Sequence, residues 1–169
     1  MVVGKDLKVL MIGNSFSICV GRHLPSIVHS VPDNHLLLAS AYIGGCDLER
    51  HWNNVVQAKD DPDFKPYQAN VWDSSIPLES KRFKDNVNHL LTMEKWDVVT
   101  IQQASHFSWR PETYEPFAGN LIAFIRENAP QAEIVIQQTW SYRASDPRIN
   151  EGGAWGFDQT EMYNRLSDA

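Results

Sequence analysis

Residues that would cross-link the fold or bind a metal are scarce in this sequence. Only two cysteines, Cys19 and Cys46, occur among its 169 residues. Two are too few for a disulfide framework, and their spacing is not that of a zinc site. No two histidines have the i, i+4 spacing of a helical metal site. We therefore expect two buried thiols, no metal and no cofactor.

An excess of basic residues and a long apolar run are also missing. Lysine and arginine number 15 against 21 aspartates and glutamates, giving a net charge of −6, which argues against a nucleic-acid partner. No apolar run approaches the roughly 20 residues of a membrane-spanning helix, so no membrane partner is expected. Residues 1–5 lack a signal-peptide pattern. We expect a cytoplasmic protein, or a mature periplasmic or secreted form whose signal peptide has been removed.

Apolar runs alternate with segments of helical periodicity along the whole chain, without repeats or an internal boundary. This pattern is typical of a single α/β domain, here residues 1–169, with a mostly parallel sheet. The expected strands are 9–12, 35–43, 96–103 and 133–140. The expected helices follow Ser15 and cover 46–56, 79–93, 112–128 and 156–166, while 59–77 is irregular with a small hairpin near 67–76.

A buried strand stops at Gly13-Asn14-Ser15, where helical spacing begins. The corner places the Ser15 hydroxyl beyond the carboxyl end of a central strand, where open α/β sheets bind ligands. It also lies at a helix amino terminus, which favours developing negative charge. A nucleophile needs this placement. The alternative is that Ser15 or Ser17 is only the N-cap of the helix.

Two further strand ends carry features of the same kind. Gly44-Gly45 ends the second strand, and a doubly wound sheet would bring the Gly45 N–H close to Ser15; alternatively, the glycines only make a tight turn. The third strand ends in Gln102, Gln103, Ser105 and His106. A side-chain amide there can donate to an oxyanion, or it can pin the following loop.

Several blocks resemble those of the SGNH, or GDSL-like, hydrolases. Residues 12–17 (Ile-Gly-Asn-Ser-Phe-Ser) resemble the family's first block, with asparagine where aspartate is commoner, and residues 44–51 resemble its second block. Residues 96–105, with 137–142, are similar to a bacterial subgroup of SGNH-like proteins. The similarity covers most of the chain, and the order and spacing of the blocks make it specific.

The resemblance implies a three-layer α/β/α fold with a five-stranded parallel, flavodoxin-like sheet, and a serine hydrolase acting on esters. It maps the nucleophile to Ser15, whose N–H would donate to the oxyanion together with the N–H of Gly45. The family's third donor is an asparagine side chain, for which this sequence offers Gln103, with Gln102 and Ser105 as rivals. A small-molecule or carbohydrate ester is the implied substrate, and deacetylation is one such reaction. We expect Asn14, His106 and Trp140 to contact it, although Trp140, like Trp109, is equally suited to packing.

The sequence departs from the family pattern in one block. The family places its histidine base and aspartate in a late D-x-x-H motif, which does not occur in these 169 residues. We therefore expect a truncated domain that lacks its last strand and helix, with His106 as the best substitute base. A homodimer through the exposed sheet edge would follow. The alternatives are a non-enzymatic flavodoxin-like phosphate or nucleotide module and an inactive hydrolase fragment.

Overall fold

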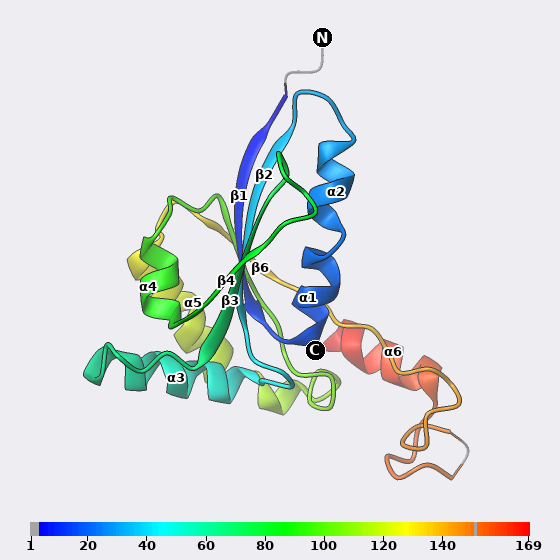
Figure 1. Ribbon diagram of the computed structural model, residues 1–169. Coiled ribbons are helices and arrows are strands. Elements are labelled where there is room, and N and C mark those ends of the chain that lie inside the picture. The colour runs from blue at the N-terminus through cyan, green and yellow to red at the C-terminus, as the bar shows by residue number, and fades with distance from the viewer. Residues whose placement is uncertain (1–3, 151) are drawn as a thin grey trace.

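One six-stranded sheet organises the molecule, in the order β4-β3-β2-β1-β5-β6 (Figure 1). The computed structural model describes residues 4–150 and 152–169. The strands are β1 (Asp6–Gly13), β2 (His35–Tyr42), β3 (Tyr67–Asp73), β4 (Lys81–Asp85), β5 (Val98–Ile101) and β6 (Glu133–Ile136).

The sheet is mixed rather than wholly parallel. β1 pairs in parallel with β2 and β5, and β6 pairs in parallel with β5, whereas β3 and β4 add antiparallel pairings beyond β2. Counted alone, the parallel strands have the 2-1-3-4 order of flavodoxin-like sheets. The α/β class and the mostly parallel sheet are confirmed, and the five-stranded, all-parallel sheet is wrong.

Helices cover both faces of the sheet, and β1 is therefore buried on both sides. Leu10 and Ile12 join a large core beneath α3 (Leu48–Asp60), α4 (Val87–Thr92) and α5 (Phe117–Asn128). Val9 and Met11 point the other way, into a smaller core beneath α1 (Ser15–Gly21) and α2 (Leu24–His29). Figure 1 shows the resulting three layers.

The segment 79–93 differs most from the sequence prediction. Instead of one helix it forms strand β4, which pairs with β3, and then the short helix α4. Asn86 separates the two, because its side chain accepts a hydrogen bond from the His89 N–H at 2.9 Å and so caps α4. The expected hairpin near 67–76 is the single strand β3, and its partner is β4.

Prolines shift two helix boundaries. The helical spacing after Ser15 is divided between α1 and α2, and Pro25 lies in the first turn of α2, where its missing N–H is harmless. The predicted helix over 112–128 is a short 3₁₀ turn, Pro111–Thr113, followed by α5 after Pro116.

The last part of the chain forms a small cluster of its own beside the sheet. α6 (Gln159–Asp168) supplies Met162 and Leu166, which are buried against Ile149. Aromatic side chains pack around these three residues, namely Trp109, Tyr142, Trp155 and Phe157. In Figure 1 this segment runs below and beside the sheet, and the chain ends near the start of α1.

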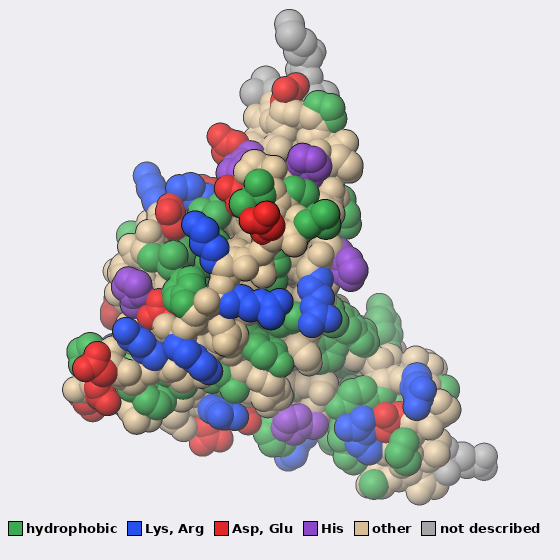
Figure 2. Space-filling view, in the orientation of Figure 1, with side chains coloured by type: hydrophobic (Ala, Val, Ile, Leu, Met, Phe, Trp, Pro, Cys, Tyr) green, Lys and Arg blue, Asp and Glu red, His purple; other side chains and the backbone are tan. Residues whose placement is uncertain are grey.

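The two edges of the sheet differ in character. Edge strand β4 exposes Lys81, Arg82 and Lys84, and Figure 2, which looks onto this edge, shows basic side chains across it. The opposite edge strand, β6, exposes Val135 and Ile136. Among the residues described, no helix is long and apolar enough to span a bilayer.

Candidate functional site

The predicted corner at Ser15 is present. β1 ends at Gly13, α1 begins at Ser15, and the Ser15 side chain is exposed at the carboxyl edge of the parallel strands. Ser15 does not cap the helix. That role belongs to Asn14, whose side-chain oxygen accepts a hydrogen bond from the Phe16 N–H at 3.3 Å. The Ser15 hydroxyl is therefore left free for chemistry.

Asn14 joins three strand ends. Its exposed fraction is 1%. Its Nδ2 donates to the carbonyls of Cys46, at 3.0 Å, and Gln103, at 3.3 Å, and its Oδ1 also accepts from Gln102 Nε2 at 3.0 Å. Because these bonds occupy a buried carboxamide completely, none of its donors or acceptors is left over for the substrate contact expected of Asn14. The residue instead fixes the corner that presents Ser15.

The second corner meets the first, as the topology predicts. The Ile43 N–H donates to the Gly13 carbonyl at 3.2 Å, which extends the pairing of β1 and β2 into the loops. Gly45 follows in an exposed turn with a φ of +63° that favours glycine. In the described part of the chain, neither the Ser15 N–H nor the Gly45 N–H has a protein acceptor. Both expected backbone donors therefore remain available.

Gln103 does not fit the role expected of it. Its Oε1 accepts from the N–H of Leu48, at 3.1 Å, and of Ala104, at 2.8 Å, which anchors the start of α3. Its Nε2 donates to the carbonyl and the hydroxyl of Thr113, at 3.0 and 3.2 Å. Both N–H bonds are used, so Gln103 has none left for an oxyanion. It pins the following loop, which was the alternative interpretation.

The two rivals for that role have different surroundings. Gln102 is buried and donates to Asn14, but its Oε1 has no partner among the described residues. The Ser105 hydroxyl lies 2.7 Å from the Tyr142 hydroxyl. This contact ties the last part of the chain to the loop after β5.

Trp140 lies where a substrate contact is useful. It is 52% exposed, and its ring meets the Phe16 ring edge-on, with 4.1 Å between the ring centroids. Phe16 follows Ser15 directly, so Trp140 forms an apolar surface beside the serine. His106 is half-buried in the loop after β5, and its ring packs on Phe107 at 4.2 Å.

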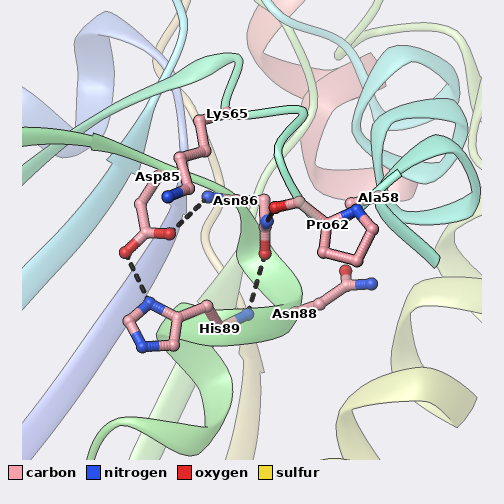
Figure 3. A pocket seen from close by; sticks show the side chains of 7 residues that line it. All are labelled: Ala58, Pro62, Lys65, Asp85, Asn86, Asn88 and His89. Carbon is pink, nitrogen blue, oxygen red and sulfur yellow. Dashed lines mark hydrogen bonds and ion pairs between the residues drawn. The ribbon is translucent and has the colours of Figure 1, made fainter. Parts of the chain in front are cut away.

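A histidine paired with a carboxylate occurs at two places, and neither belongs to the Ser15 corner. His35 Nε2 contacts Asp73 at 2.8 Å, and His89 Nδ1 contacts Asp85 at 2.7 Å. Figure 3 shows the second pair in a hollow of about 320 Å³ whose lining contains no hydroxyl or thiol that could act as a nucleophile. His106 makes no hydrogen bond with any residue that the structure describes.

The two thiols differ in exposure, and the potential metal ligands of the described residues do not cluster. Within residues 4–150 and 152–169, no group of three or more His, Cys, Asp or Glu is placed to hold a metal ion. Cys46 is buried, as expected, and burial raises the pKa of its thiol to about 12, which leaves it unreactive. Cys19 is exposed, so the expectation that both thiols are buried is wrong for it.

The structure adds residues that the sequence prediction missed. Thr113 and Tyr142 hold Gln103 and Ser105 in place, across separations of 10 and 37 residues. No periodic pattern in the sequence marks such pairs. The linking role of Asn14 had a visible signal, because asparagine before a helix is a favoured N-cap.

Comparison with known proteins places the chain in a family. Residues 8–169 match the family model described as "Domain of unknown function (DUF4886)". The chain belongs to the DUF4886 family. A crystal structure of a DUF4886 protein from Bacteroides uniformis ATCC 8492 superimposes with a TM-score of 0.82 at 27% identity. The match covers 97% of this chain and 61% of that one, so this chain spans about three fifths of its relative.

A second solved structure relates the DUF4886 fold to a hydrolase fold. It is a candidate SGNH hydrolase from Slackia heliotrinireducens, with a TM-score of 0.56, 21% identity, and coverage of 97% of this chain and 71% of that one. At this identity the likeness concerns the fold alone. The mixed α/β architecture with its six-stranded sheet is thus similar to an SGNH hydrolase fold. No curated protein matches the sequence.

Proposed function

We propose that this DUF4886 chain carries the nucleophilic corner of an SGNH-type serine esterase, with Ser15 as the nucleophile. One observation carries the proposal. The exposed Ser15 hydroxyl stands at the joined ends of β1 and β2, where the Ser15 and Gly45 N–H groups have no protein acceptor in the described part of the chain. The likeness to a candidate SGNH hydrolase supports the reaction class.

The reaction would run through an acyl-enzyme. Ser15 Oγ attacks the carbonyl carbon of the ester, and its proton passes to a base. The negative charge that develops on the carbonyl oxygen is held by the Ser15 and Gly45 N–H groups. The tetrahedral intermediate collapses and expels the alcohol, which takes up the proton. Water then attacks the acyl-Ser15 ester and releases the carboxylic acid.

The base is an imidazole in this proposal. His106 is the candidate from this chain, because it lies in the loop that leaves the carboxyl end of β5. The histidines that pair with carboxylates lie elsewhere, and His51 is fully buried. His106→Gln should lower the rate at which Ser15 reacts by at least roughly a hundredfold.

The substrate we propose is a small acyl ester of a carbohydrate or a related alcohol. Trp140 supports this choice, because a half-exposed indole beside the nucleophile offers an apolar face on which a sugar ring can stack. Trp140→Ala should then raise KM for a carbohydrate ester while leaving kcat for a minimal acetyl ester nearly unchanged.

The test is covalent labelling with a fluorophosphonate, followed by peptide mass spectrometry. The proposal predicts one adduct, on Ser15, that is lost in Ser15→Ala. Ser30→Ala is the matched control, since Ser30 is an exposed serine at the end of α2 and should leave the adduct in place. A phosphate-binding module would take up nucleotide or phosphate without labelling, and an inactive fragment would do neither. Either result would refute the proposal.

A further inference from the structure

Three buried polar groups lie directly beneath the Ser15 corner, and the proposed reaction does not use them. Gln102 is 1% exposed and Ser17 is fully buried. Gln102 Oε1 and Ser17 Oγ have no hydrogen-bond partner among the described residues. Because an unpaired buried polar atom is costly, this arrangement needs a reason. The third group, the Asn14 carboxamide, connects Gln102 to the corner that carries the nucleophile.

The connection runs through Oδ1 of Asn14. This oxygen accepts from the Phe16 N–H at 3.3 Å and from Gln102 Nε2 at 3.0 Å. The first bond caps α1, and the second ties the cap to the end of β5. Without the second bond, Asn14 could turn its carboxamide, and the cap that sets the direction of Ser15 would be less firmly held.

Gly13 brings Gln102 and Ser17 together. A Cβ added to Gly13 would collide with Ser17 Oγ and would lie 2.7 Å from Gln102 Nε2. Both side chains therefore pack against the same backbone carbon.

We propose that Gln102 is a positioning residue for Ser15, acting through Asn14 and packed beside Ser17 against Gly13. This inference rests on the proposed function, because its consequence is the reactivity of Ser15. The group at position 102 must donate a hydrogen bond to Asn14 Oδ1. A carboxamide can donate, and so can a neutral carboxylic acid, whereas a carboxylate only accepts.

That difference provides a pH signature. In Gln102→Glu, the neutral acid should replace the amide at low pH, and ionisation at higher pH should turn the donor into an acceptor that faces Asn14 Oδ1. The ratio of variant to wild-type labelling rates should be near one at about pH 5 and at least roughly tenfold lower by about pH 9. In Gln102→Leu, the ratio should be low at every pH.

Gln138→Glu is the matched control, since Gln138 is an exposed glutamine just beyond β6. Its ratio of labelling rates should stay near one.

The rate is measured as the maximal rate of fluorophosphonate inactivation, separately from probe affinity, and thermal unfolding confirms that each variant is folded. Loss of positioning should lower the maximal rate and leave the affinity unchanged. A Gln102→Glu ratio that does not change with pH, or a Gln102→Leu variant that labels at the wild-type rate, would overturn the inference.

A second readout does not depend on activity. Hydrogen exchange at the Asn14 side-chain amide, followed by NMR, should be slow in the wild type and at least tenfold faster in Gln102→Leu, with Gln138→Glu unchanged. If wild-type Ser15 does not label, the proposed function fails, while the exchange experiment still tests whether Gln102 holds the Asn14 carboxamide. Unchanged exchange in Gln102→Leu would contradict the positioning role of Gln102 itself.

Discussion

At Gly13, the last residue of β1, side chains from α1 and from the end of β5 pack against the backbone. Its missing Cβ leaves the space that Ser17 and Gln102 occupy. Gly13→Ala should therefore lower the free energy of unfolding by about 1–3 kcal/mol, since the added methyl group overpacks a buried corner. Urea unfolding measures the change. Gly45→Ala is the contrast, because a Cβ there meets nothing within 4 Å and only the φ of +63° opposes it; about 1 kcal/mol is expected.

His51 illustrates a second effect at the scale of one residue. It is fully buried, and its Nδ1 lies 2.9 Å from the hydroxyl of Tyr67, which also accepts a hydrogen bond from Asn54 Nδ2. The Tyr67 hydroxyl therefore donates to a neutral His51. Burial, with a smaller contribution from the positive charge of Arg50, lowers the pKa of His51 to about 3. The folded protein thus resists binding a proton that the unfolded chain accepts below about pH 6.5.

The free energy of unfolding should consequently fall as the pH is lowered. Between about pH 6.5 and pH 3 the unfolded state binds more protons, so the free energy of unfolding should drop by up to about 1.4 kcal/mol per pH unit from this group. Urea unfolding at pH 7, 6 and 5 measures the slope, and His51→Gln should flatten it. Equal slopes for the variant and the wild type would mean that His51 is not the residue responsible.

At the scale of the element, the sequence predicted the parallel strands and missed strand β4, which pairs with β3 at the edge of the sheet. The runs around Leu10 and Leu38 are apolar on both faces, which marks a strand between two helical layers. In residues 79–93, by contrast, Phe83, Val87 and Leu90 fit a helical period. The sequence pattern therefore predicted a helix where β4 forms. Only its pairing with β3 makes it a strand, and that pairing is a long-range contact that local spacing does not encode.

Edge strand β6 carries a prediction of its own. Its exposed Val135 and Ile136 present an apolar, unprotected edge among the described residues, whereas β4 carries lysines and an arginine. We propose that β6 pairs with a second copy of the chain. Light scattering coupled to size exclusion should show a dimer that Ile136→Lys reduces to a monomer. Leu78→Lys, which alters a 94% exposed leucine in the loop between β3 and β4, on the opposite side of the sheet order from β6, should leave the dimer intact.

At the scale of the whole molecule, the fold was easier to predict than the site. The order of strands and helices follows from local patterns, and the corner at Ser15 follows from a strand that stops at a glycine. Beyond their immediate neighbours in the chain, the partners of Asn14 and Gln103 lie in three separate segments, at residues 46–48, 102–103 and 113. Tertiary packing therefore decides which amide pins a loop, and local spacing could not show that both N–H bonds of Gln103 are used within the protein.

The central claim is that Ser15 is an activated nucleophile, and fluorophosphonate labelling of the purified chain tests it most directly. Intact mass and peptide mapping should show one adduct per chain on Ser15, absent in Ser15→Ala and retained in Ser30→Ala. An adduct on another residue, or no adduct on the folded wild-type protein, would contradict the account.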